Sequence, residues 1–162
     1  MNSKPFLIIG MIVSFVIASM LNVYPLGYDL AKLRPMFLAM TLVFWVMYRS
    51  TMLGVWSVFL VGMVSDLLLG THLGHQAFSA VLMAFVVRIL LLYAKELALS
   101  QAWLLGTIGL VVYQLSLWVL QAFSYNEFIW LGFGSLATSI MLFPLLWYPL
   151  YWVNAQLKER AF

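Results

Sequence analysis

The chain has no cysteine and very little charge. Lys, Arg, Asp and Glu make up 8% of its 162 residues, whereas a soluble domain carries about 25%. The absence of cysteine excludes disulfides and thiol chemistry. The shortage of charge excludes a water-facing surface, so we expect an integral membrane protein. The net charge of +3 is scattered along the chain, which gives no basic patch for nucleic acid.

Residues of the kinds that carry catalysis or bind metals are also few. The two histidines, His72 and His75, lie beside one loop, and no cysteine or carboxylate cluster joins them to complete a zinc site. The sequence holds five acidic residues, without a nucleophile–base pair, paired carboxylates or a phosphate-binding loop. We therefore expect neither an enzyme nor a bound metal or cofactor.

Hydrophobic residues, by contrast, make up 65% of the chain and form six apolar runs. Backbone polar groups in lipid must be satisfied internally, so each run is expected to be a helix, and about 20 residues suffice to cross a bilayer. The predicted spans are Phe6–Val23, Leu33–Tyr48, Met52–Leu69, Ala77–Tyr93, Leu104–Phe123 and Phe128–Val153. The connections are short, so the sequence predicts an all-α integral membrane protein with one transmembrane domain over residues 1–162.

The first span could be mistaken for a cleavable signal peptide, because Lys4 precedes an apolar run. That run ends Ala18-Ser19-Met20-Leu21-Asn22, which lacks the small-x-small pattern of a cleavage site. We therefore expect a retained first helix.

The second and third spans are separated only by Arg49, Ser50 and Thr51. One continuous helix from Leu33 to Leu69 would be about 55 Å long at 1.5 Å per residue. A hydrocarbon core is only about 30 Å thick. We therefore expect a tight helical hairpin that turns at Arg49.

Positive charge predicts the orientation of the spans, because Lys and Arg are enriched in cytoplasmic loops. With the N-terminus inside, the outer side receives only Lys32 and Arg34. The inner side receives the other six basic residues: Lys4, Arg49, Arg88, Lys95, Lys158 and Arg160. Six spans with this bias place both termini on the cytoplasmic side.

One carboxylate, Asp66, lies inside an otherwise apolar run. An Asp at the centre of a membrane helix costs about 2.5–3.5 kcal/mol on insertion scales, so this side chain is expected to face protein. Arg34 falls at the same predicted depth, and its planar fork would match a carboxylate. Two interpretations stay open. In one, Arg34 and Asp66 form a pair; in the other, Arg34 extends to the lipid headgroups while Asp66 caps the fourth helix or is hydrated.

Small residues mark two helices as candidates for close packing. Gly62, Asp66 and Gly70 recur at every fourth position and share a face, with Gly54 partly rotated from it. Small residues at this spacing let another helix approach closely. Gly70 and Gly74 are expected to break the third helix and to bring the fourth helix close to it. The sixth helix carries a similar set, formed by Gly132, Gly134, Ser135 and Thr138.

The fifth helix carries Thr107, Gln114 and Gln121 at seven-residue intervals, on one stripe. Such groups commonly hydrogen-bond between membrane helices. Contacts within the protein are therefore favoured over a substrate path.

Three features are typical of one bacterial family. The second span begins Arg34-Pro35-Met36-Phe37-Leu38. The third ends in the block Gly62-x-x-x-Asp66-Leu67-Leu68-Leu69-Gly70-Thr71-x-Leu73-Gly74. The last feature is the plan of the whole chain, with six short-looped spans and almost no soluble part. In these features the chain resembles MreD, the rod shape-determining membrane protein family.

The resemblance implies a part in cell elongation at the bacterial cytoplasmic (inner) membrane. Proteins similar to MreD act with MreC, whose single helix anchors a periplasmic domain, and with MreB, RodA and a class B penicillin-binding protein in lateral peptidoglycan synthesis. The resemblance also implies a fold similar to the substrate-binding components of energy-coupling-factor transporters. It carries over no catalytic residues.

Two functions follow as alternatives. The first is a non-catalytic scaffold that binds the MreC helix amid membrane lipid and helps to regulate wall synthesis and rod shape. The second is small-solute or lipid binding or transport, suggested by the implied fold. The spans hold few polar side chains, which favours the scaffold.

Overall fold

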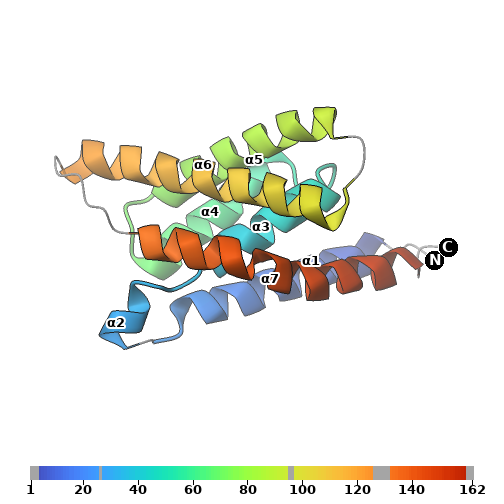
Figure 1. Cartoon of the computed structure of the whole chain (residues 1–162), viewed down its shortest axis with the longest axis horizontal. Helices are drawn as coiled ribbons and strands as arrows, with labels where there is room; N and C mark the ends of the chain where they lie inside the picture. Colours follow the sequence, from blue (N-terminus) through green and yellow to red (C-terminus); the bar gives the residue numbers. More distant parts are fainter. Residues whose placement is uncertain (1–3, 26, 95–96, 126–131, 160–162) are drawn as a thin grey trace.

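The computed structural model describes residues 4–25, 27–94, 97–125 and 132–159, and the regular structure in these ranges is helical (Figure 1). Six long helices and one single-turn helix follow in order. They are α1 (Lys4–Val23), α2 (Tyr28–Ala31), α3 (Phe37–Tyr48), α4 (Val55–Leu69), α5 (His75–Tyr93), α6 (Leu99–Tyr125) and α7 (Phe133–Glu159). The expectation of an all-helical protein is confirmed.

The helix bounds differ from the predicted spans mainly where hydropathy alone was used to draw them. The second predicted span began at Leu33, but α3 begins at Phe37, because a residue that precedes proline, here Arg34, disfavours helical geometry. The third began at Met52, but α4 begins at Val55, after Gly54 in an extended conformation. The fourth began at Ala77, whereas α5 begins at His75.

The last two long helices continue beyond their apolar runs into polar sequence. α6 begins at Leu99, before the predicted Leu104, and α7 ends at Glu159, after the predicted Val153. The predicted start of the last span, Phe128, lies outside the described residues, as do two of the basic residues used for the orientation, Lys95 and Arg160.

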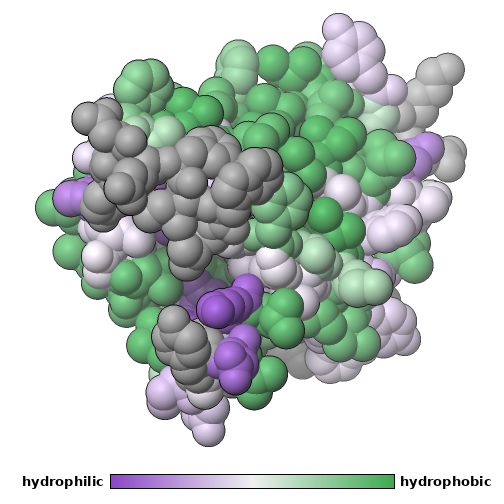
Figure 2. Space-filling view, turned by 60° about the vertical axis from the view of Figure 1, so that its left-hand side comes forward, coloured by the Kyte–Doolittle hydropathy of each residue, from purple (hydrophilic) through white to green (hydrophobic). Residues whose placement is uncertain are grey.

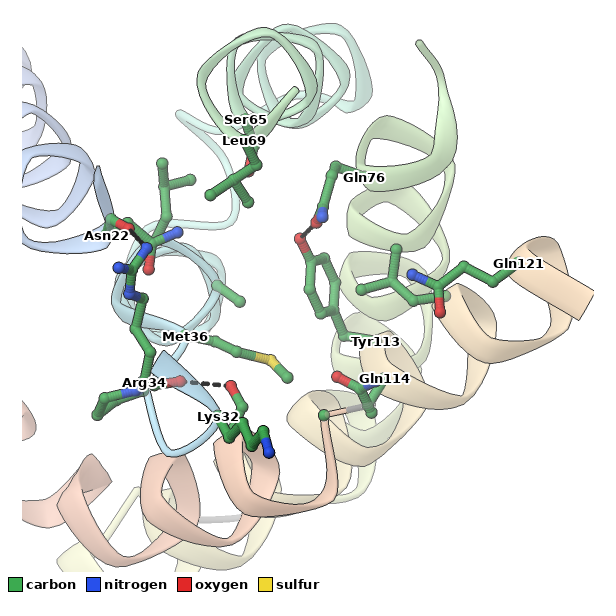
Figure 3. Close-up of a pocket in the computed structure, with 16 residues that line it drawn as sticks. Asn22, Lys32, Arg34, Met36, Ser65, Leu69, Gln76, Tyr113, Gln114 and Gln121 are labelled. Carbon is green, nitrogen blue, oxygen red and sulfur yellow. Dashed lines mark hydrogen bonds between the residues drawn. The ribbon is translucent and has the colours of Figure 1, made fainter. Parts of the chain in front are cut away.

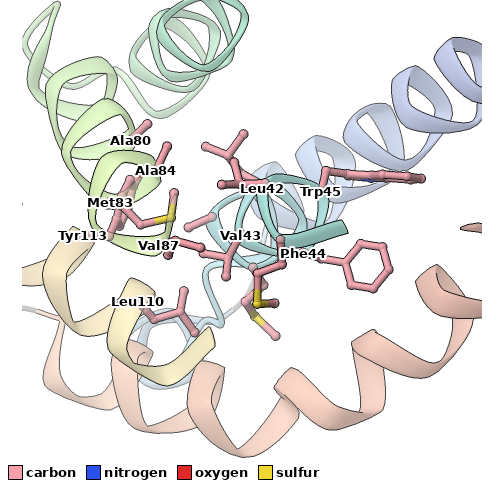
Figure 4. Close-up of a cluster of buried hydrophobic side chains, with 14 of the residues drawn as sticks. Leu42, Val43, Phe44, Trp45, Ala80, Met83, Ala84, Val87, Leu110 and Tyr113 are labelled. Atoms are coloured by element: carbon pink, nitrogen blue, oxygen red, sulfur yellow. The ribbon is translucent and has the colours of Figure 1, made fainter. Parts of the chain in front are cut away.

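α3 is the centre of the bundle. All ten residues from Leu38 to Met47 are buried, and α3 packs against α1, α5, α6 and α7. Figure 4 shows Trp45 directed toward α1 and Val43 facing Met83 and Val87 of α5. The Trp45 Nε1 group donates a hydrogen bond of 2.8 Å to Ser14 Oγ of α1. A helix that is apolar on every face is thus enclosed by protein on every face.

The chain turns at Arg49, as expected for a hairpin, and the Arg49 N–H caps α3 by bonding to the Trp45 carbonyl. The two helices then diverge. In the described part of the chain, α4 packs chiefly against α5, whereas α3 contacts the other helices of the bundle. The expected close pair of α4 and α5 is therefore present.

Within the described ranges, four helices are long and apolar enough to cross a membrane: Pro5–Val23 in α1, α5, Leu99–Ser124 in α6 and Phe133–Gln156 in α7. α3 and α4 are apolar but shorter, with 12 and 15 residues, or about 18 and 22 Å. The start of α1 and the end of α7 lie at one end of the molecule (Figure 1). The shortness of α3 leaves space at the opposite end.

Candidate functional site

Asp66 lies in the last turn of α4 and is fully buried. Its Oδ1 accepts hydrogen bonds from Thr71 Oγ1 at 2.7 Å and from the Gln76 N–H at 2.9 Å. Its Oδ2 accepts from the Gly74 N–H at 2.9 Å and from the Ala77 N–H at 3.3 Å. The first N–H groups of a helix have no partner within it and favour negative charge. Asp66 therefore caps the start of α5, as the second of the two interpretations expected for this side chain.

Two glycines shape the turn that carries these donors. Gly70 ends α4 with φ +63°, and Gly74 precedes α5 with φ +99°, a region that favours glycine. The Thr71 N–H donates a 3.1 Å hydrogen bond to the Asp66 carbonyl, which is the long bond of a Schellman motif. Asp66 thus uses both its main chain and its side chain to close the turn.

Gly62 lies one turn before Asp66 and faces α5. A Cβ atom on Gly62 would lie 2.3 Å from Ala77 Cα and 2.8 Å from Ala77 N, so the two backbones are in direct contact. The face formed by Gly62, Asp66 and Gly70 was expected to accept a neighbouring helix, and that helix is α5 of the same chain. Gly54, expected near this face, has no atom within 4 Å of such a Cβ.

Arg34 holds a different helix end. Its Nη1 donates a 2.6 Å hydrogen bond to the Asn22 carbonyl and its Nη2 a 2.8 Å bond to the Tyr24 carbonyl. These carbonyls belong to the last turn of α1 and the residue after it, where a cation is favoured. Arg34 and Asp66 therefore have separate partners, and each one secures a helix terminus.

The start of α7 binds the segment that leads into α3. Ser135 Oγ donates a 2.5 Å hydrogen bond to the Arg34 carbonyl, and Thr138 Oγ1 donates a 2.9 Å bond to the Leu33 carbonyl. A Cβ on Gly134 would lie 2.9 Å from the Lys32 carbonyl oxygen. The small and hydroxyl residues predicted for packing on this helix thus contact the chain itself.

These contacts enclose a cavity of about 240 Å³ at the end of the molecule opposite the described termini. Figure 2, turned toward this end, shows hydrophilic side chains beside a hollow in a largely hydrophobic surface. Polar or charged side chains contribute much of its lining, and we call it the polar pocket; these residues are Asn22, Lys32, Arg34, Ser65, Gln76, Tyr113, Gln114, Gln121 and Ser135. Its remaining lining includes Pro35, Met36, Leu38 and Ala39, at and before the start of α3.

Several polar groups of the pocket come from different helices and converge on it (Figure 3). The Tyr113 hydroxyl of α6 donates a hydrogen bond to Gln76 Oε1 of α5. Gln114 is only 3% exposed, and its side-chain amide has no hydrogen bond to a described residue. Gln114 instead lies against Gly132, whose φ is +110° and whose Cβ position is 2.6 Å from Gln114 Nε2.

The comparison with protein families decides the assignment. The family described as "rod shape-determining protein MreD" matches residues 3–154. The chain belongs to the MreD family. Comparisons with curated proteins and with solved structures found no match. Membership of the MreD family makes this a membrane protein of rod-shape determination.

Arg34, Asp66 and Thr71, which belong to the pattern that made the chain resemble MreD, have hydrogen-bond partners within the chain, whereas the polar pocket was not predicted. Of the polar stripe on the fifth predicted span, Gln114 and Gln121 line the pocket, while Thr107 Oγ1 bonds to the Trp103 carbonyl of its own helix. The stripe was the one available signal. Asn22, Ser65 and Gln76 are isolated in the sequence, and only the fold brings them together.

Proposed function

We propose that this MreD-family protein is a non-catalytic scaffold that binds the transmembrane helix of MreC. In this proposal the chain crosses the cytoplasmic membrane six times as one domain with both termini inside. MreB, RodA and a class B penicillin-binding protein belong to the wider assembly that regulates lateral peptidoglycan synthesis. Family membership supports the role in shape, and the surface of the helices supports the mode of binding.

The observation that carries the proposal is an apolar groove between α1 and α4. It has a volume of about 270 Å³, and α1 packs more closely on α3 than on α4. Its walls are apolar apart from Ser19, with Leu38 of α3 at its base; the lining residues are Ile12, Phe15, Val16, Ser19, Leu38, Leu60, Val61 and Val64.

A helix fits this groove better than the small-residue faces. Van der Waals packing drives association between helices in lipid, and a groove offers more contact area than a convex helix surface. The faces around Gly62 and Gly134 are filled by the chain itself. MreC binding therefore has to use surfaces that remain exposed, and Leu60 and Val64 are 62% and 51% exposed.

Co-purification of MreC with the full chain tests this proposal. Val64→Trp fills the groove and is expected to reduce MreC recovery at least 10-fold at matched expression. Leu115→Trp is the control, since Leu115 on α6 is 50% exposed and lies outside the groove. Equal recovery with both variants would contradict binding in the groove.

A second candidate function is the binding of a small solute or a lipid headgroup, as in a protein related to energy-coupling-factor substrate-binding components. The observation in its favour is the polar pocket. Binding there and MreC binding in the groove use different residues, so the two functions are compatible and separately testable.

A further inference from the structure

The polar pocket contains hydrogen-bonding groups that the protein itself leaves unused. Gln114 and Asn22 are 3% and 7% exposed, and their side-chain amides have no hydrogen bond to any described residue. A buried amide without a partner costs free energy, so such groups are normally satisfied by protein, water or ligand. Both side chains line the pocket, so their amide groups are placed to form hydrogen bonds with a molecule that occupies it.

The charge around the pocket favours an anion. Lys32 and Arg34 are among its lining residues, and none of the described lining residues is a carboxylate. The start of α3 also borders the pocket through Met36, Leu38 and Ala39. The N-terminus of a helix carries a partial positive charge, which is a common setting for phosphate. The Met36 N–H donates to Ser139 Oγ and the Phe37 N–H to the Pro35 carbonyl, so the N–H groups of Leu38 and Ala39 are the donors that this terminus offers.

The size of the pocket limits the ligand to a small group. A volume of about 240 Å³ corresponds to roughly eight water molecules at ~30 Å³ each. That is enough for a phosphate with a short polar substituent, and too little for an acyl chain. The apolar tail of a lipid would therefore have to remain outside the pocket.

We propose that the polar pocket binds a phosphate ester, with its anionic oxygens held by Lys32, the N-terminus of α3 and the amides of Asn22 and Gln114. A phosphomonoester offers three strong acceptor oxygens, and the phosphodiester of a phospholipid headgroup offers two unesterified ones. Either set suits donors that converge from α1, α6 and the segment before α3. The ester is either a soluble phosphomonoester or the headgroup of an anionic phospholipid. This inference rests on the second candidate function and is independent of MreC binding.

Thermal unfolding of the full chain, purified in a neutral detergent, tests the proposal with glycerol 3-phosphate as the soluble probe. For the lipid source, the same measurement compares nanodiscs of phosphatidylglycerol with nanodiscs of phosphatidylcholine. We expect one probe to raise the Tm of the wild-type chain in a saturable manner. Lys32→Gln and Gln114→Leu should each weaken this binding at least 10-fold.

Gln101→Leu is the matched control, because Gln101 lies on the same helix but is exposed and lies outside the pocket. It should bind as the wild-type chain does. Gln114→Leu should also leave the Tm of the ligand-free protein unchanged or raise it, because the Gln114 amide lines the pocket and makes no hydrogen bond to a described residue that the change would break. A purely structural Gln114 would instead lower that Tm.

Three results would overturn the inference. One is the absence of a saturable Tm shift with either phosphate source. Another is an equal shift with sodium acetate, which would show that the pocket binds small anions of another class. The last is undiminished binding by Gln114→Leu and Lys32→Gln, which would place the phosphate elsewhere. None of these results bears on MreC binding, which is tested separately by the co-purification of MreC with the chain.

Discussion

Asp66 is a buried charge whose partners are mostly backbone N–H groups. Three of its four hydrogen bonds come from the main chain of the turn and the first residues of α5. An ionised carboxylate has two oxygens that can each accept more than one hydrogen bond, so it can satisfy all of these donors. This explains why an acidic residue is present in the apolar sequence and why no basic partner is needed for it.

Replacing Asp66 is expected to destabilise the protein according to how many acceptors are lost. Asp66→Leu orphans three N–H groups, of which those of Gln76 and Ala77 are buried, at a cost of about 3 kcal/mol or more. Asp66→Asn keeps one acceptor oxygen and should fall between Asp66→Leu and the wild-type protein. The free energy of unfolding in detergent measures this, with the exposed Asp29→Asn as the control. A wild-type stability for Asp66→Leu would contradict the capping role.

Gly62 in α4 and Gly54, the residue just before α4, should respond very differently to the same small change. Gly62→Ala places a methyl group 2.3 Å from Ala77 Cα, so α4 and α5 must separate, at a cost of about 2 kcal/mol or more. Gly54→Ala has open space around the new methyl group and should alter stability by less than ~0.5 kcal/mol. Urea or thermal unfolding compares the pair, and similar losses for both would show that the close approach at Gly62 is not required.

At the scale of helices, the two charged residues of the MreD-like pattern secure different termini. Arg34 bonds to the carbonyls at the end of α1, and Asp66 bonds to the N–H groups at the start of α5. Sites without shared partners act additively within about 0.5 kcal/mol. The two residues are therefore expected to be energetically independent.

A double-mutant cycle tests this independence. We expect Arg34→Leu and Asp66→Leu to lower the free energy of unfolding by amounts that add in the double variant. The measurement is best made with Asp66→Asn as well, so that the double variant remains folded. If the double variant has the same free energy of unfolding as the less stable single variant, the two residues are coupled, as an ion pair would be.

The helices were predictable because hydrophobic runs report burial in lipid or protein, but their ends were less so. Hydropathy could not locate the start of α3, since Leu33 is apolar and yet lies before Pro35. It also missed the polar first residues of α6, such as Ser100 and Gln101. A helix ends where its backbone is capped, and Gly70 was a better guide to that than composition.

The site was predictable only where its residues are close in sequence. Gly62, Asp66, Gly70 and Gly74 lie in one block, so their joint role in a turn between packed helices could be inferred. The polar pocket joins Asn22, Gln76 and Gln114, which lie on three different helices. Without knowledge of how α1, α5 and α6 are arranged, these residues are single polar positions in apolar runs.

At the scale of the whole molecule, the helix directions fit an even number of crossings, because α1 starts and α7 ends at the same end (Figure 1). We expect cysteines placed at Ser3 or Ala161 to be protected from an impermeant maleimide added outside intact cells. The chain has no native cysteine to interfere. Cysteine at Leu73, which is 65% exposed in the α4–α5 turn, should react. If the cysteines at the termini react and the cysteine at position 73 is protected, the orientation is the reverse of the one predicted.

The central claim is that the chain holds the MreC helix in the groove between α1 and α4. Oxidative cross-linking in membranes tests it most directly, with single cysteines in the chain and a series of cysteines along the MreC helix. Leu60→Cys in the groove should give cross-links with helical periodicity, and the exposed Leu145→Cys on α7 should give few. Cross-linking from Leu145→Cys alone, or from neither position at wild-type protein levels, would contradict the account.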